Sequence, residues 1–248
     1  MKKTLLLMVL FIWAFNTQGQ SKADCPGEFE DYEEYDLCYC EQWEQPYWVS
    51  YTLEEQEIYL PSQKRLSRFL VDDNISTGSA THDDYTHSGY DRGHLSRAMY
   101  NKKTREIYRQ SYYMSNISPQ LPGFNRRGGR WYALEELEIS LSKRYDKVLS
   151  FSGPWIVDLE GKSIGENEVV IPQFFYKAIY IPEVNVGMVF FLDHTDVEDD
   201  RPLSDQLMTV DDFESMTGID FFTDISDDSF EKKVPDWFCE DVLMAERK

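Results

Sequence analysis

The sequence is poor in basic residues: it contains 25 lysines and arginines against 45 aspartates and glutamates, and its formal net charge is −20. Phosphate contacts require lysine and arginine, so this balance argues against a protein that binds nucleic acid over its whole surface. Long apolar runs are missing after residue 15, and no later stretch is suited to span a bilayer. Repeats, low-complexity tracts and an interdomain linker are absent as well. A chain of 248 residues with these features fits one sizeable domain.

The N-terminus has the features of a secretory signal. Lys2 and Lys3 provide positive charge, Leu5–Phe15 forms a short apolar core, and a polar stretch follows to Gln20. The apolar run is too short to span a bilayer comfortably. We therefore predict a signal peptide at residues 1–20, no membrane span, and a secreted or periplasmic product. A retained membrane anchor is the alternative.

Cysteine is scarce, and the four cysteines, Cys25, Cys38, Cys40 and Cys239, all follow the N-terminal apolar run. An even number of cysteines in an exported chain predicts two disulfides. Cys38 and Cys40 are too close in sequence to bond each other easily, so we expect one of them to bond Cys25 and the other to bond Cys239. A zinc site is the alternative, but Cys-x-Cys without a nearby histidine is a poor zinc spacing.

The part of the chain after the N-terminal signal predicts an α+β fold. Residues 21–46 are acidic and aromatic with little periodicity, which predicts an irregular N-terminal segment pinned by disulfides. Residues 47–248 then form the main domain. Strands are expected at 47–52, 148–151 and 155–157, with a break at the Gly-Pro pair between the last two.

Two helices are predicted from spacing and capping signals. One covers residues 210–217, with Gly218 as its C-cap. The other begins near residue 130, where apolar residues recur at spacings of three and four: Trp131, Leu134, Leu137, Leu141 and Tyr145. This second helix is the most regular pattern in the chain.

The basic residues that are present are clustered. Between residues 92 and 130 the chain has one acidic residue, Glu106, and nine basic ones: Arg92, Arg97, Lys102, Lys103, Arg105, Arg109, Arg126, Arg127 and Arg130. A positive island on an acidic body focuses the electrostatic field on one cleft. The alternative is that these side chains are scattered over solvated faces. We favour the cleft, because the island coincides with the polar motifs described next.

Those motifs contain the groups that metal-assisted phosphodiester cleavage needs. His94 is suited to act as a base, because an unperturbed imidazole is half neutral near pH 6.5. Arg92 offers a rigid fork of donors to phosphate. Asn125 and Glu135 offer oxygens to a divalent cation, and Mg²⁺ takes few protein ligands because it keeps most of its waters. Each residue alone has an ordinary structural explanation, so the weight lies in their combination.

In this order the motifs resemble a known family. Asp91-Arg92-Gly93-His94, Ser115–Gln120, Phe124-Asn125 and Trp131-x-x-x-Glu135 are similar to motifs of the DNA/RNA non-specific endonucleases, the ββα-metal nucleases related to the Serratia nuclease and endonuclease G. The resemblance covers roughly residues 46–225. It implies a single domain with a central antiparallel sheet flanked by helices.

The resemblance also implies roles for the catalytic residues. The motif histidine is His94, the general base, and the motif arginine is Arg92, which contacts phosphate. A second phosphate arginine, upstream of the motif, is expected at Arg65, with Arg68 as the alternative. Asn116 matches a supporting polar residue of the catalytic set.

Metal and substrate contacts are implied in the same way. Asn125 is the expected ligand of Mg²⁺, with Mn²⁺ as the alternative ion. The carboxylate that orients metal-bound water is expected at Glu135, with Glu136 as its rival. Further contacts to substrate are expected from four residues: Gln120, Arg126, Arg127 and Arg130.

The chain departs from the family pattern at several positions. The spacing between Asn125 and Trp131 is two residues longer than expected, which leaves the register between Asn125 and Glu135 open. Arg97 stands where proline is common, and Tyr112 stands where some members have asparagine.

The resulting hypothesis is a secreted, divalent-metal-dependent endonuclease that cleaves DNA and RNA with little sequence preference and leaves 5′-phosphates. The first alternative is a catalytically inactive extracellular nucleic-acid-binding or interaction protein with the same fold. The second is a zinc hydrolase that uses His82, His87, His94 and either Asp83 or Asp84. The oligomeric state, monomer or homodimer, stays open.

Overall fold

The computed structural model describes residues 23–158, 161–196 and 201–239. The predicted signal peptide, residues 1–20, lies outside the described residues. Within them, no helix is both long and apolar enough to cross a membrane.

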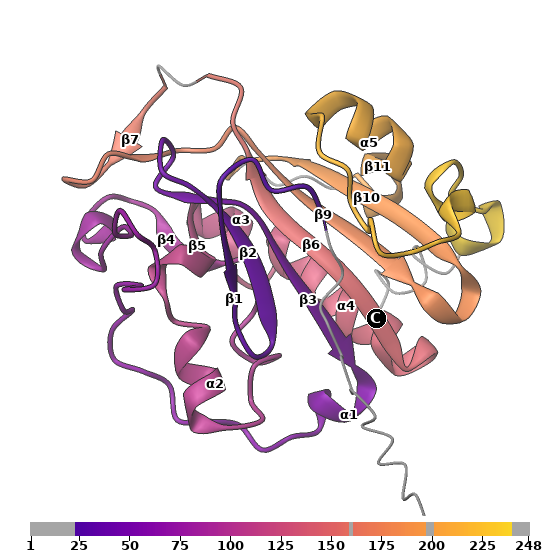
Figure 1. Cartoon of the computed structure of the whole chain (residues 1–248), viewed down its shortest axis with the longest axis horizontal. Coiled ribbons are helices and arrows are strands. Elements are labelled where there is room, and N and C mark those ends of the chain that lie inside the picture. Colours follow the sequence, from indigo (N-terminus) through magenta and orange to yellow (C-terminus); the bar gives the residue numbers. More distant parts are fainter. Residues whose placement is uncertain (1–22, 159–160, 197–200, 240–248) are drawn as a thin grey trace, which may run out of the picture.

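A seven-stranded antiparallel sheet forms the centre of the protein (Figure 1). Its strands follow the spatial order β1 (Glu28–Asp31), β2 (Tyr35–Cys40), β3 (Gln45–Glu54), β6 (Lys147–Trp155), β9 (Phe174–Ile181), β10 (Val186–Asp193) and β11 (Leu207–Met208). The predicted strand at 47–52 is confirmed within β3. The irregular structure expected for residues 21–46 is wrong, because β1 and β2 pair with each other and β2 pairs with β3.

β6 is one strand where two were expected, although it contains Gly153 and Pro154. The pairing between β3 and β6 ends at Ser152, so Pro154 lies beyond the ladder with β3 and its missing N–H leaves no bond unmade on that side. A side chain at Gly153 would meet the carbonyl oxygen of Tyr47 at 2.2 Å. The small residue thus allows the two backbones to approach closely.

Helices cover both faces of this sheet. On one face lies α4 (Arg130–Tyr145), and on the other lies α5 (Val210–Thr217) (Figure 1). The predicted apolar stripe of α4 is buried, and α5 ends at Gly218 with φ +71°, so both helix predictions are confirmed. Successive residues of the central strands enter different cores; Val148 packs beneath α4 and Leu149 packs beneath α5. The predicted α+β fold with a central antiparallel sheet flanked by helices is therefore confirmed.

Smaller elements surround the central sheet. A two-stranded antiparallel ribbon is formed by β4 (Asp91–His94) and β5 (Ile117–Gln120), and a short hairpin is formed by β7 (Ser163–Ile164) and β8 (Val169–Val170). The short α-helices are α1 (Glu55–Ile58), α2 (Arg105–Gln110) and α3 (Pro122–Asn125). The 3₁₀ helices are η1 (Asp83–Tyr85), η2 (Met114–Asn116), η3 (Pro182–Val184), η4 (Leu203–Gln206) and η5 (Asp228–Glu231).

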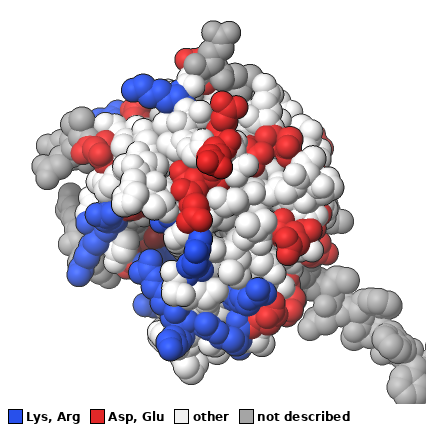
Figure 2. Space-filling model, turned by 90° about the vertical axis from the view of Figure 1, so that its left-hand side faces the viewer, with Lys and Arg blue, Asp and Glu red and all other residues white. Residues whose placement is uncertain are grey.

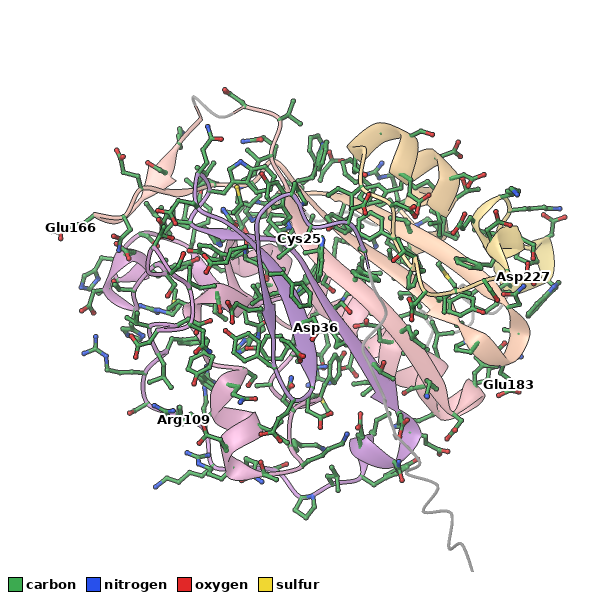
Figure 3. All side chains as sticks on the ribbon, in the orientation of Figure 1. Cys25, Asp36, Arg109, Glu166, Glu183 and Asp227 are labelled. Carbon is green, nitrogen blue, oxygen red and sulfur yellow. A yellow bond between two sulfur atoms is a disulfide. The ribbon has the colours of Figure 1, made fainter. Side chains whose placement is uncertain are left out.

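One disulfide joins Cys25 to Cys38, which confirms one half of the cysteine prediction (Cys25 is labelled in Figure 3). The other half is wrong, because Cys40 and Cys239 are both free. Cys40 is buried in an apolar cluster with Trp43, Ile156 and Val170. Cys239 follows Phe238, whose ring packs against Tyr145 of α4 in a different core. Packing therefore holds the two thiols in separate parts of the molecule.

A buried ion pair fixes α4 to the sheet. Lys177 of β9 and Glu138 of α4 are fully buried, and their charged atoms lie 2.9 Å apart. Lys177 Nζ also donates to Tyr51 Oη and Ser152 Oγ, at 2.6 and 2.8 Å, and lies 4.7 Å from the ring centroid of Trp131. A buried charge is tolerated only when it is paired and hydrogen-bonded, so these contacts form one interdependent unit.

We expect Lys177→Met to lower the free energy of unfolding by about 3–5 kcal/mol, because it leaves the Glu138 carboxylate buried without its cation. Chemical denaturation measures this change. The matched control is Lys147→Met, whose partner Glu54 lies 3.5 Å away at a partly exposed site. That control should cost less than about 1 kcal/mol. Equal losses in the two variants would contradict the special weight of the buried pair.

Candidate active site

Arg92 and His94 project from the same side of β4, because side chains alternate along a strand. The ring of Phe69 lies beside both: its centroid is 6.0 Å from Arg92 Cζ and 5.2 Å from the His94 ring centroid. Arg92 Nη2 donates to the His82 carbonyl oxygen at 2.6 Å and to Thr86 Oγ1 at 3.0 Å. These bonds hold the guanidinium beside the histidine, and its Nη1 makes no hydrogen bond with any described residue.

His94 lies partly exposed between the rings of Phe69 and Tyr112, with centroid distances of 5.2 and 5.4 Å. Its Nε2 is buried and has no hydrogen-bond partner among the described residues. Burial lowers the pKa of His94 to about 3, and the positive charges of Arg65 and Arg97 add to this effect. The imidazole is therefore neutral near pH 7. Buried polar atoms normally have partners, so an unpartnered ring nitrogen marks a place for water or a ligand.

Asn125, at the end of α3, is held by Asp91 of β4. Asn125 Nδ2 donates to Asp91 Oδ2 at 3.1 Å, and Arg126 donates to both carboxylate oxygens at 2.7 and 2.8 Å. Burial raises the pKa of Asp91, but these hydrogen bonds outweigh it and lower the pKa below its usual value. Because a carboxylate only accepts, the amide nitrogen must face Asp91. The amide oxygen of Asn125 is thus left without a partner among the described residues, and a hard oxygen of this kind suits Mg²⁺.

The position of α3 depends on two residues that are distant in sequence, His194 and Asp196. His194 Nε2 accepts from the Leu121 N–H at 2.8 Å, while Nδ1 donates to the Pro172 carbonyl at 2.8 Å. The Gly123 N–H donates to Asp196 Oδ1 at 2.7 Å. Sequence reasoning missed His194 and Asp196, which lie 73 residues from their partners in α3 and carry no periodic or motif signal.

Glu135 comes from α4, whose first turn is tied to the ribbon. Trp131 Nε1 donates to the His94 carbonyl oxygen at 3.1 Å, and Glu135 lies one turn further along the same helix face. Glu135 is buried, and its Oε2 lies 3.2 Å from Arg97 Nε. Burial raises the pKa of Glu135 to about 7, although Arg97 and Lys177 oppose this rise. The neighbouring Glu136 is about half exposed and pairs with Arg97 Nη1 at 3.0 Å.

The longer spacing after Asn125 is accommodated by a turn. Arg126 accepts a hydrogen bond from the Gly129 N–H at 2.7 Å, and Gly128 has φ +95°. A side chain at Gly129 would meet the Phe124 carbonyl oxygen at 2.2 Å. The two extra residues therefore fold back against α3, and α4 begins directly after them at Arg130.

Two further predicted residues lie inside the protein. Asn116 is fully buried; its Oδ1 accepts from the Ser96 N–H at 2.8 Å, and its Nδ2 donates to the Ser96 and Ser111 carbonyls at 2.9 Å. It fixes the loop that follows His94. Gln120 is also fully buried, and neither of its amide atoms has a partner among the described residues. It packs against Gly93 on the neighbouring strand.

The predicted arginines differ in their engagement. Arg65 is exposed, and its charge acts on His94, whereas Arg68 makes a two-pronged contact with Asp83 at 3.0 Å. Arg127 is exposed, and Arg130 Nη2 donates to Gln206 Oε1 at 2.6 Å. Figure 2 shows the face of the molecule that lies at the left of Figure 1. Basic side chains gather on one part of that face, and acidic side chains gather on another.

Two other groups of residues are candidate metal sites, and neither corresponds to the site described above. His82, His87 and His94 form no three-residue metal cluster in the described ranges, so the zinc alternative has no structural support. Asp211, Glu214 and Glu231 do lie within 4.8 Å of one another. They belong to α5 and η5, across the sheet from α4, and are not part of the predicted site.

The antiparallel ribbon with His94, followed by α3 with Asn125 and α4 with Glu135, defines a nuclease of the ββα-metal class. The chain belongs to the DNA/RNA non-specific endonuclease family, whose profile matches residues 17–228. The resemblance seen in the motifs is thereby confirmed, and the protein is a hydrolase of a divalent-metal-dependent nuclease family. The alternative of a catalytically inactive binding protein is not supported.

Individual relatives agree with this assignment. Human mitochondrial endonuclease G is 28% identical over 221 residues, which cover 83% of this chain and 73% of the relative. The mitochondrial nuclease EXOG of Xenopus laevis is 30% identical, with 81% and 60% covered. A crystal structure of the EndoG/EndoGI complex matches with a TM-score of 0.73 and 26% identity, and the match covers 81% of this chain and 87% of the other.

These comparisons correct the predicted localisation. A secreted or periplasmic product is contradicted, because human endonuclease G and Xenopus EXOG are both mitochondrial nucleases. The prediction depended on the charge and apolar run of residues 1–20. Those residues lie outside the described part of the chain, and composition alone did not distinguish their destination.

We expect Gly93→Ala to reduce both stability and nuclease activity. The added Cβ would lie 2.2 Å from Gln120 Oε1, and Gln120 is fully buried, so its side chain would have to shift within packed surroundings. Overpacking of this kind costs about 1–3 kcal/mol. Thermal denaturation and plasmid cleavage would be measured together. The double variant Gly93→Ala/Gln120→Ala should recover much of the lost stability, and no recovery of stability would contradict the steric explanation.

Stability should fall with decreasing pH because of His94. Its pKa is about 3 in the folded state and about 6.5 when unfolded, so the unfolded chain binds the extra proton between these values. The free energy of unfolding then decreases below about pH 6.5, by up to about 1.4 kcal/mol per pH unit from this group. Replacing His94 by Gln should flatten the slope measured by denaturation, and His87→Gln is the control for loss of an exposed imidazole. Identical slopes in wild type and His94→Gln would refute the assignment.

Proposed function

We propose that this protein is an endonuclease that uses a divalent metal ion to hydrolyse phosphodiester bonds in DNA and RNA with little sequence preference. The observation that carries the proposal is the neutral, unpartnered Nε2 of His94 beside Arg92, on the same ribbon that holds Asn125 through Asp91. Membership of the family supports it.

His94 serves as the general base, which takes a proton from the attacking water. Its low pKa keeps the imidazole unprotonated before substrate binds. A bound phosphodiester brings negative charge toward a ring that otherwise senses Arg65 and Arg97. That charge raises the pKa of His94 and makes it a stronger base at the moment when a proton must be taken.

Arg92 and Arg65 contact the non-bridging phosphate oxygens. Arg92 is held by His82 and Thr86, and its Nη1 makes no hydrogen bond with any described residue. Arg65 is favoured over Arg68, which is already paired with Asp83. Further along the substrate, the exposed Arg127 is a contact, and Arg126 and Arg130 contribute to the same positive surface. Contacts to the backbone carry affinity but no sequence information, which fits cleavage without strong sequence preference.

Asn125 would hold Mg²⁺, or Mn²⁺ in its place, through its amide oxygen, with Glu135 orienting a metal-bound water. When bound, the ion provides positive charge at the leaving 3′-oxygen. Asp91 and His194 act as positioning residues for α3, and Asn116 and Gln120 do the same for the ribbon. Breaking the bond between phosphorus and the 3′-oxygen leaves a 3′-hydroxyl on one fragment and a 5′-phosphate on the other.

The test is cleavage of plasmid DNA and of RNA by His94→Ala. We expect activity to fall by a factor of at least about 100, the lower end for losing a general base, while the thermal unfolding temperature stays near that of wild type. His87→Ala, at an exposed position, is the matched control and should cleave normally.

The same assays define the metal and the products. EDTA should abolish cleavage, and Mg²⁺ or Mn²⁺ should restore it, whereas Ca²⁺ serves as a comparison. End labelling should find 5′-phosphates. Substantial cleavage by His94→Ala, or full activity in EDTA, would remove His94 or the metal from the mechanism.

A further inference from the structure

Arg97 lies against two carboxylates of α4, those of Glu135 and Glu136. It follows His94 by three residues, in the loop that Asn116 fixes. Its Nε lies 3.2 Å from Glu135 Oε2 and its Nη1 lies 3.0 Å from Glu136 Oε1. Its Cζ is 5.3 Å from the centroid of the Tyr132 ring, and the side chain is only 21% exposed. Three successive contacts to one helix therefore hold a fixed cation at the proposed site.

This cation partly neutralises the carboxylate on which the site depends. Arg97 stays charged, since its pKa is raised by Glu135 and its neighbours despite burial. The same charge reaches His94, whose pKa it helps to lower. A carboxylate already paired with a guanidinium attracts a second cation less, because the two positive charges repel each other at short range.

We propose that Arg97 weakens divalent-metal binding at the site formed by Asn125 and Glu135, and so sets the metal concentration at which the nuclease becomes active. This inference depends on the proposed function, because it assumes that Asn125 and Glu135 serve the metal. Arg97 acts through Glu135 and is a positioning residue, not a catalytic one.

Glu136 is a second partner for Arg97, so the guanidinium can stay paired when Glu135 turns to a metal ion. Arg97 contacts Glu135 through Nε and Glu136 through Nη1, so it keeps one partner when it gives up the other. Glu136 is about half exposed and can follow the arginine, whereas Glu135 is buried and has less freedom. When a metal ion draws on Glu135, the guanidinium remains held by Glu136 and Tyr132, and no buried charge is left unpaired.

The experiment is Mn²⁺ titration of the purified protein without nucleic acid, with free Mn²⁺ measured by electron paramagnetic resonance. Arg97→Gln should bind Mn²⁺ at least tenfold more tightly than wild type. Arg97→Lys, which keeps the charge, should stay within about threefold of wild type, since ammonium and guanidinium repel a cation alike. Arg97→Met is the second neutral variant, and thermal denaturation confirms that each variant is folded.

Arg109→Gln controls for the loss of one positive charge far from the carboxylates. Arg109 projects outward from α2, is about half exposed, and pairs with Glu106 at 3.6 Å (Figure 3). Its Mn²⁺ affinity should equal that of wild type. If folded Arg97→Gln and Arg97→Met bind Mn²⁺ no more tightly than wild type, the role of Arg97 is overturned.

Asn125→Ala separates this failure from failure of the proposed function. If wild type binds Mn²⁺ and Asn125→Ala loses that binding, the metal site stands whatever Arg97 does. If neither wild type nor the neutral Arg97 variants bind Mn²⁺, or if Asn125→Ala binds it as wild type does, the metal site itself is misplaced and both proposals fall.

Discussion

The position of α4 is the constraint on which the proposed site depends. The buried ion pair between Lys177 and Glu138 connects the middle of α4 to β9 of the central sheet. The Trp131 indole N–H donates to the His94 carbonyl oxygen and connects the first turn of α4 to β4. Glu135 lies between these two attachments. The helix is thus fixed both to the sheet, which gives stability, and to the ribbon that carries the histidine, so one element connects folding with catalysis.

The charge distribution resolves the conflict between an acidic chain and a polyanionic substrate. The protein has a net charge of −20, yet Arg65 and Arg92 place positive charge beside one imidazole, that of His94. The acidic residues elsewhere do not cancel these charges, because exposed charges separated by more than about 10 Å are largely screened at ordinary salt. Local placement, not the sum of charges, therefore determines whether phosphate can approach.

Structural features that depend on short stretches of sequence could be predicted. Features that depend on pairing between residues distant in sequence could not. The helix from Trp131 to Tyr145 and the glycine cap at Gly218 follow from local periodicity and backbone preference, and both are confirmed. The ordered motif around His94 and Asn125 identifies the class from the sequence alone. By contrast, β1 is acidic, and neither β1 nor β2 shows clean alternation. Their strand character comes from the pairing of β1 with β2 and of β2 with β3, which no local pattern reports.

The same reasoning explains the missed partners of the site. His194 and Asp196 become important only because β10 delivers them beside α3, and the ion pairs of Arg97 arise because a loop meets α4. Cys239 could not pair as expected, because Phe238 anchors its segment near Tyr145, away from Cys40. Sequence identifies which groups are chemically capable, but the tertiary fold decides which of them meet.

The two edge strands of the sheet, β1 and β11, affect how readily copies of the protein pair edge to edge. β11 contains only two residues, and β1 contains four with the sequence Glu-Phe-Glu-Asp. Exposed strand edges can template pairing with another chain, and short or charged edges suppress it. Like charges along β1 would face like charges in any edge-to-edge copy. The acidity that looks unfavourable for a nuclease thus protects its open sheet against aggregation.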